Sequence, residues 1–219
     1  GEQAPVSPHW WATQAVLSTT ASTTAAGAAA QHNASGTPTA TAGTWSVGGG
    51  GFVVSSATAT DFVYAFTTPE ESYSTMIIRL TYQLSAADTL RMQIGSGGTL
   101  STSGIYQTTH AYRNTSTWSG AVITGATGWS VAAVNHGKPT ADATGAAQGE
   151  IVMHAINNTS FSKNAACRFG WYDSGSDAAL MIATCRAAGL STAVNIIRIY
   201  PATGTTTFMQ NSIISISFT

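Results

Sequence analysis

Apolar and polar residues alternate one by one through the middle of the chain. Between Met76 and Gln83 every even position is apolar or aromatic, whereas the odd positions include Arg79 and Thr81. The run Leu90–Ile94 repeats this alternation. Because side chains point to opposite faces of a strand with a period of two, both runs are predicted to be half-buried strands joined by a short turn.

Short apolar runs separated by turn residues continue from Trp45 almost to the last residue. They recur at the spacing typical of sandwiches and barrels, and no long helical periodicity interrupts them. The sequence therefore predicts an all-β fold, a jelly-roll-like antiparallel β-sandwich of two sheets. The expected strands are Trp45–Val47, Phe52–Ser55, Phe62–Phe66, Thr75–Gln83, Leu90–Ile94, Ile105–Thr108, Ala121–Thr124, Trp129–Val134, Glu150–Ala155, Ala166–Trp171, Leu180–Cys185, Val194–Tyr200 and Ile213–Phe218.

The beginning of the chain has a different composition. Residues 1–43 are rich in Ala, Thr, Ser and Gly, whereas residues 44–219 hold the alternating runs. The first segment has too little apolar bulk to fold alone, so we expect an extended low-complexity N-terminal arm before a β-sandwich domain. Two interpretations stay open: the arm packs on its own subunit, or it lies on a neighbouring subunit with Trp10 and Trp11 as its anchor. Large aromatic side chains are unfavourable near a chain end unless another surface covers them.

Charge is scarce along the whole chain. Charged residues make up 8% of the sequence and the net charge is -1, while 43% of the residues are hydrophobic. Nucleic-acid binding needs a basic patch, and the few lysines and arginines are scattered, so we expect no nucleic-acid partner. The uncharged stretch from Ala12 up to Asp61 lacks the Leu and Ile content of a membrane span, and no signal peptide is recognisable, so we expect no membrane contact.

Two cysteines flank a turn-like segment at Ser174–Asp177. A tight hairpin centred between Gly175 and Ser176 would place Cys167 and Cys185 nearly opposite each other on one face. In that register Trp171 would pair with Met181, and Phe169 with Ala183. We favour free thiols packed as small hydrophobes, with a disulfide as the alternative. Their spacing does not match that of a metal site.

No catalytic constellation stands out. The chain contains no Gly-x-Ser-x-Gly string, and its five histidines are widely separated. Most of the carboxylates fall at predicted turns, where they cap local backbone. We therefore expect a protein that is not an enzyme, with no catalytic residue, no bound metal and no cofactor.

Aromatic residues supply a candidate binding site. Tyr106, Tyr112 and Trp118 fall in the stretch Gly104–Gly120, which reads as rich in loops and also contains an arginine, a histidine and an asparagine. Sugars stack on exposed aromatic faces while amide and guanidinium groups bind their hydroxyls, so this stretch is a candidate glycan or receptor site. The alternative is a long surface loop whose aromatic residues pack on the sandwich or fill a contact between subunits.

Two segments carry a family resemblance. The first runs from Asp61-Phe-Val-Tyr-Ala-Phe to Tyr106 and includes Ala87-Asp-Thr-Leu-Arg-Met-Gln and Gly97-Gly. The second includes Gly149-Glu-Ile-Val-Met-His, Ala193-Val-Asn-Ile-Ile-Arg-Ile-Tyr and the closing strand Asn211–Phe218. Together they resemble phage virion structural proteins of the tail-fibre, appendage and capsid-decoration type. Thr203-Gly-Thr-Thr stands where those proteins have a Gly-Asn loop, and the closing strand also departs from theirs.

The resemblance implies a location for the protein rather than a reaction, since its motifs are strand and turn features. It implies a structural component of a bacteriophage particle, located in the virion as a tail fibre, spike or capsid decoration. We expect its partners to be other copies of itself, in a homotrimer, together with other virion proteins and a host surface glycan. The alternative is a free carbohydrate-binding module or lectin.

Overall fold

The computed structural model describes residues 32–33, 38–48, 51–66, 74–102, 105–114, 117–136, 146–172, 178–188 and 190–219. The chain divides into two units, residues 1–30 and residues 31–219. All described residues belong to the second unit. Trp10 and Trp11 lie outside them, so their role as an anchor stays a prediction.

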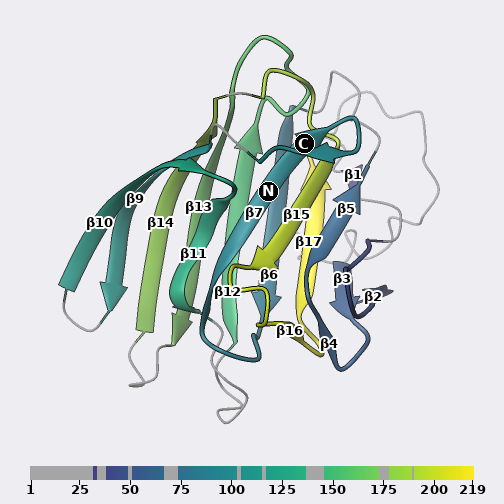
Figure 1. Cartoon of the computed structure of the whole chain (residues 1–219), viewed down its shortest axis with the longest axis vertical. Coiled ribbons are helices and arrows are strands. Elements are labelled where there is room, and N and C mark those ends of the chain that lie inside the picture. Colours follow the sequence, from purple (N-terminus) through teal and green to yellow (C-terminus); the bar gives the residue numbers. More distant parts are fainter. Residues whose placement is uncertain are drawn as a thin grey trace, which may run out of the picture. The chain divides into compact units, whose positions relative to one another are not determined.

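A long antiparallel sheet of ten strands forms one layer of this unit (Figure 1). Its strand order is β10-β9-β14-β13-β12-β6-β17-β3-β2, and β1 pairs with the remaining part of β17. Their bounds are β1 His32–Asn33, β2 Trp45–Gly48, β3 Gly51–Val54, β6 Thr75–Tyr82, β9 Ile105–Asn114, β10 Thr117–Ala126, β12 Ala147–His154, β13 Lys163–Tyr172, β14 Ala178–Ala187 and β17 Ile213–Phe218.

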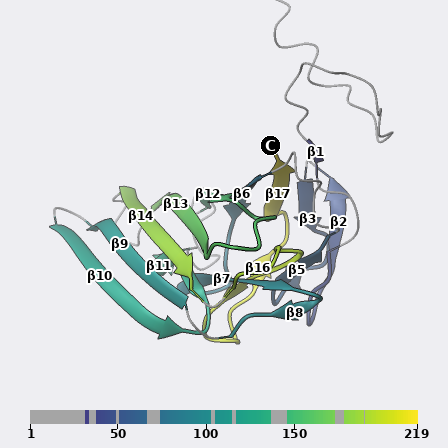
Figure 2. The ribbon, with the colours of Figure 1, turned by 90° about the horizontal axis from the view of Figure 1, so that it is seen from above.

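A shorter antiparallel sheet forms the second layer, and the long sheet bends around it (Figure 2). Its order is β11-β7-β15-β5, with β8 added to β7, and a separate two-stranded ladder joins β16 to β4. The bounds are β4 Thr58–Ala59, β5 Phe62–Ala65, β7 Asp88–Ser96, β8 Thr99–Leu100, β11 Trp129–His136, β15 Ile196–Pro201 and β16 Phe208–Met209.

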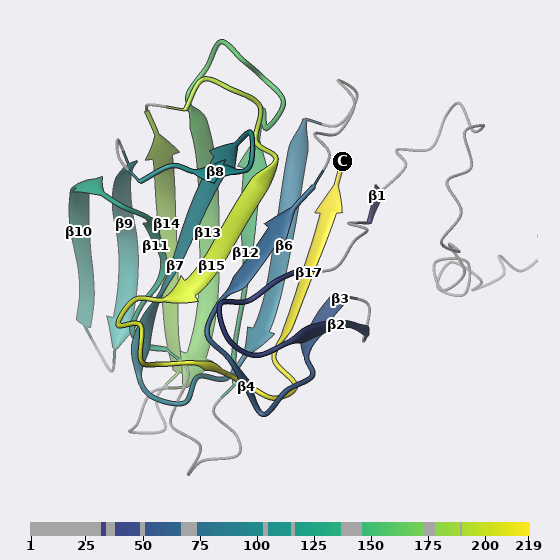
Figure 3. The same cartoon turned by 45° about the vertical axis from the view of Figure 1, so that its right-hand side comes forward.

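Pairs of strands pass together from one sheet to the other. β6 pairs with β12 in the long sheet, and their chain neighbours β7 and β11 pair in the short sheet. In the same way β6 pairs with β17, whereas β7 pairs with β15. Figure 3 shows β17 between β6 and β3. This winding is typical of a double-sheet jelly roll, so the predicted all-β, jelly-roll-like antiparallel sandwich is confirmed.

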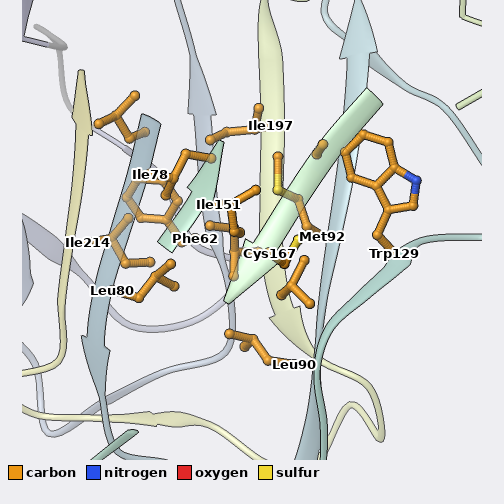
Figure 4. Close-up of a cluster of buried hydrophobic side chains, with 14 of the residues drawn as sticks. Phe62, Ile78, Leu80, Leu90, Met92, Trp129, Ile151, Cys167, Ile197 and Ile214 are labelled. Carbon is orange, nitrogen blue, oxygen red and sulfur yellow. The ribbon is translucent and has the colours of Figure 1, made fainter. Parts of the chain in front are cut away.

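The core fills the space between the two sheets (Figure 4). Ile78, Leu80 and Ile151 point into it from the long sheet, and Met92 and Trp129 from the short one. The alternation predicted for the strand at Met76–Gln83 is confirmed, because the even positions of β6 are buried. At the β3–β5 end the core is aromatic, with a run of ring contacts through Trp45, Phe52, Phe62, Tyr64, Phe66 and Phe208.

Part of the segment that we expected in the arm lies on the sandwich. Thr39 and Val63 of β5 exchange two backbone hydrogen bonds of 2.8 Å. The buried carboxylate of Asp61 accepts hydrogen bonds from the Thr41 amide (2.6 Å) and hydroxyl (2.9 Å), and it pairs with Arg198 at 2.9 Å. These contacts fasten residues 39–41 over the open edge of β5.

The interpretation of Gly104–Gly120 as a stretch rich in loops is wrong. Apart from residues 103–104 and 115–116, which are not described, this stretch belongs to β9 and β10. β9 is hydrogen-bonded to β14 on one side and to β10 on the other. Thr, Ser, Tyr and Gly occur at neighbouring positions here, so no apolar alternation reveals the strands, yet their backbone completes two ladders.

The two cysteines lie on one face, as predicted, but in a different register. Cys167 pairs with Ala183 and Cys185 with Ala165, so the two cysteines are diagonal neighbours and Phe169 pairs with Met181. The pairing reaches Tyr172 and Ala178, so residues 173–177 separate the two strands in sequence, more than the tight turn that we assumed. Both thiols are free and buried, and their sulfur atoms lie 3.9 Å apart. The hydrogen bond between them, together with burial, raises the pKa of Cys167.

Candidate ligand surface at the Arg186 end of the long sheet

A row of polar residues crosses the outer face of the long sheet near one end of its strands. Thr75 of β6 is in register with His154 of β12, which is in register with Asn164 of β13, followed by Arg186 of β14. The side chains of His154, Asn164 and Arg186 are exposed. Thr75 Oγ1 and His154 Nδ1 share a hydrogen bond of 3.0 Å. The row therefore offers an imidazole, an amide and a guanidinium group on adjacent strands.

The loop between β12 and β13 borders this row. Asn158 shapes it, since its side-chain oxygen accepts hydrogen bonds from the amides of Ser160 (2.7 Å) and Phe161 (2.9 Å). Buried Ile156 anchors the loop, because its amide donates to the Ser74 carbonyl at 3.1 Å. The Ile156 carbonyl also accepts a hydrogen bond of 2.8 Å from the Val194 amide. The loop backbone is thus tied to two other segments of the sandwich.

Lys163 holds the same loop from beneath. It is 0% exposed, and its ammonium donates to the carbonyl oxygens of Ala155, at 3.1 Å, and of Asn158. Burial lowers the pKa of Lys163. A buried cation that satisfies two loop carbonyls keeps Ala155 and Asn158 at fixed positions, although Ala155 has the unusual φ of 56°.

An open hollow of about 490 Å³ lies between the loop and the row, lined by Ser160, Phe161, Ser162, Asn164 and Arg186. The Phe161 ring is 67% exposed, and Arg186 Nη2 donates to Ser162 Oγ at 3.4 Å. Hydroxyl, amide and guanidinium groups therefore surround a solvent-exposed aromatic ring. This combination suits a sugar ring, whose C–H face stacks on the aromatic ring while its hydroxyls or a carboxylate bind the polar groups.

For the three residues predicted to bind a glycan, the structure describes only the backbone and its strand register. Tyr106 is in register with Arg186, Tyr112 with Met181, and Trp118 with Arg113. Their side chains lie outside the description, so the predicted contact stays a prediction. Of the three residues, Tyr106 is the strand neighbour of a residue that lines the hollow.

Sequence reasoning missed the residues that line the hollow. Asn157-Asn158-Thr-Ser before a predicted strand is a turn signal, and the aromatic residue that follows it could have been noticed. The burial of Lys163 and the register between Asn164 and Arg186 depend on contacts distant in sequence, and no local pattern reveals them.

Two carboxylates are buried among the described residues, and both serve structure. Asp61 binds Thr41 and Arg198, and Asp88 accepts hydrogen bonds from the amide (3.0 Å) and the hydroxyl (2.7 Å) of Thr203. Within the described ranges no three His, Cys, Asp or Glu side chains are placed to hold a metal ion. The same part of the chain has no helix of the length and hydropathy that crossing a membrane requires.

Comparison with known proteins adds no relative: no family model, curated protein or solved structure matches the chain.

Proposed function

We propose that this chain is a structural, non-enzymatic component of a bacteriophage particle, a tail fibre, spike or capsid decoration, that contacts a glycan on the host surface. The proposal draws on the resemblance of its strand motifs to phage virion proteins and on its nearly uncharged sequence. Proteins built into particles gain stability from repeated contacts between subunits, which suits a sandwich with a low-complexity arm.

The observation that carries the glycan contact is the exposed Phe161 ring on a loop held by Lys163. An exposed aromatic side chain on a fixed loop loses little conformational freedom when a ligand binds, so more of the contact energy appears as affinity. Arg186, Asn164 and two serines supply hydrogen-bond donors around the ring. The chemistry favours a sugar, and in particular one with a carboxylate that the guanidinium group can bind.

Binding to polysaccharide extracted from the host surface tests this contact. Phe161→Ala and Arg186→Ala are each expected to weaken binding about tenfold or more, since each removes a contact worth about 1.4 kcal/mol or more. Arg168→Ala is the matched control, because Arg168 is an exposed arginine on the same strand as Asn164 but is paired with Ile182. Equal binding by all three variants would remove Phe161 and Arg186 from the proposal. The triple variant of Tyr106, Tyr112 and Trp118 to Ala tests the site predicted from the sequence in the same assay.

The assembly part of the proposal concerns residues 1–43. They would attach the sandwich to other copies of the chain and to other virion proteins, with Trp10 and Trp11 as the anchor and a homotrimer as the expected assembly. Deleting residues 1–31, which keeps β1 and residues 39–41, should abolish incorporation into particles, which sedimentation of purified particles measures. Full incorporation of the shortened chain would contradict this role.

A second candidate is a free carbohydrate-binding module, because the hollow at Phe161 would serve such a protein equally well. The same deletion separates the two functions. A free module keeps its sugar binding without residues 1–31 and has no particle to join. A virion component loses its place in the particle.

A further inference from the structure

β10 ends the long sheet, and no described strand pairs with its outer edge (Figure 1). The strand runs over ten residues, Thr117–Ala126, and is bonded to β9 along one side, with register shifts between Ser119 and Ala121 and between Ile123 and Ala126. Each alternate residue of an edge strand presents its N–H and C=O groups outward, ready to pair with another chain. At ten residues β10 is much longer than the four-residue β2 at the other end of the sheet.

Two other strands in the described structure have a side that the chain itself covers. β1 and β3 together occupy the side of β17 that faces away from β6. Thr39 pairs with Val63 along β5. β10 differs also in sequence, since Thr-Trp-Ser-Gly-Ala-Val-Ile-Thr-Gly-Ala contains no charged residue and no proline. Proteins that stay monomeric protect long edges with these residue types.

The residues of β10 whose exposure the structure describes are apolar or small. Val122 is 72% exposed, and Gly120 and Thr124 on either side of it are also exposed. Val122 continues a transverse row of the outer face through Thr108, Thr184, Ala166 and Val152, which carries no charge. A second chain could extend this row without placing like charges against each other.

We infer that β10 pairs antiparallel with β10 of a second copy of this chain, about a two-fold axis at Val122. An identical strand is the occupant that the observations favour, because an uncharged strand can face itself without repulsion and an isologous contact closes after two copies. In this register Val122 faces Val122 of the second copy, and Gly120 faces Thr124. The two long sheets then join into one, and both hollows lie on the same side of it.

The inference departs from the proposed assembly in its symmetry and rests on the proposed function only for its use in the particle. It predicts a dimer contact in place of the expected homotrimer. The test uses the isolated full chain. The dimer contact can therefore be refuted while the chain is still incorporated into particles, and it can be confirmed in a protein that joins no particle.

The first measurement is the mass of the full chain in solution over a range of concentrations. A monomer–dimer equilibrium is expected. Val122→Lys should weaken the dimer at least about fivefold, because two lysines would lie directly opposite each other and a valine pair is lost. Val47→Lys is the matched control, since Val47 is a valine 76% exposed on the other terminal strand, and it should leave the dimer unchanged.

The second measurement tests the register and does not depend on destabilising the dimer. With oxidised glutathione as the oxidant, Val122→Cys should form a disulfide between two copies. Thr124→Cys should not, because in this register its partner is Gly120, and two residues at position 124 are about 13 Å apart along the strands. The native thiols are buried and leave the readout clear.

A chain that is monomeric at all concentrations, or trimeric, overturns the inference. A dimer that Val122→Lys leaves intact also overturns the inference. The same holds for a dimer that is lost only when residues 1–31 are deleted. Cross-linking of Thr124→Cys as readily as Val122→Cys would also overturn the proposed register.

Discussion

Replacing Lys163 by methionine tests whether one buried cation fixes the candidate ligand loop. Lys163 lies under the loop with its ammonium bonded to the carbonyl oxygens of Ala155 and Asn158. Methionine has a similar unbranched stem and fills much of the same space, so the change removes the donor with little change in packing. Any loss of stability then reports on the two hydrogen bonds rather than on a cavity.

The expected magnitude follows from those two carbonyls. Each buried acceptor left without a donor costs about 1–3 kcal/mol, so two cost about 2–6 kcal/mol. Part of this is regained, because methionine does not carry the desolvation penalty that lowers the pKa of Lys163. We expect a net loss of about 2 kcal/mol. In a chain of this size each kcal/mol shifts the thermal midpoint by about 2–4 °C, which gives a fall of about 4–8 °C.

Thermal unfolding and glycan binding measure the two consequences. Arg186→Met is the control for stability, since it makes the same change of charge at an exposed site and should alter the unfolding free energy by about 0.5 kcal/mol or less. Lys163→Met should also weaken glycan binding, because the loop that carries Phe161 loses its support. A Lys163→Met variant with the wild-type midpoint and wild-type binding would refute the reasoning.

The pH dependence gives an independent signature of Lys163. Its folded-state pKa is lowered below the ordinary 10.5, so the unfolded state binds more protons in the interval between the two values. The unfolding free energy of the wild type should therefore gain a rising contribution as the pH increases through that interval. Lys163→Met should lack this contribution.

Three further predictions concern the core. Tyr82→Phe should raise the unfolding free energy by about 1 kcal/mol in urea titrations, because the buried Tyr82 hydroxyl has no hydrogen-bond partner among the residues that the structure describes; a loss of stability would mean that the hydroxyl is satisfied. Burial raises the pKa of Tyr64 to about 12 and that of Tyr82 further, so above pH 10 the unfolded state binds fewer protons than the folded state. The thermal midpoint of the wild type should therefore fall as the pH rises from 10 towards 12. Asp61→Ala should cost about 3 kcal/mol, since it leaves Arg198 and Thr41 without their buried acceptor, and a cost below about 1 kcal/mol would show that water replaces it.

The strands that could be predicted are those with one apolar and one polar face. β6 shows this pattern throughout, because its even positions are buried and its odd positions are not. In β7 the alternation of burial holds as far as Met92, beyond which Gln93 and Gly95 are buried as well. Much of β9 and β10 was not predicted, since hydroxyl-rich residues and glycines leave no periodic signal, although the two strands pair with each other apart from two register shifts. The register of the cysteine hairpin was wrong by two residues, because turn length is set by how the strands pair and not by the turn residues alone.

The candidate site was hidden from the sequence for a different reason. Phe161 is a single aromatic residue in a polar loop, and local sequence does not show whether such a ring is exposed or buried. Lys163 is one of two lysines and would ordinarily be expected on the surface. Its burial follows from the loop that folds over it, and the approach of Arg186 follows from the pairing of β13 with β14.

β17 comes last in the chain order but lies in the interior of the long sheet, against β6 on one side and β3 and β1 on the other. A nascent polypeptide therefore cannot complete this layer until the ribosome has released Phe218 from its exit tunnel. Until then β6 keeps one side open to misfolding and aggregation. Translation that stops early would yield defective copies, and protease sensitivity would distinguish them from finished ones.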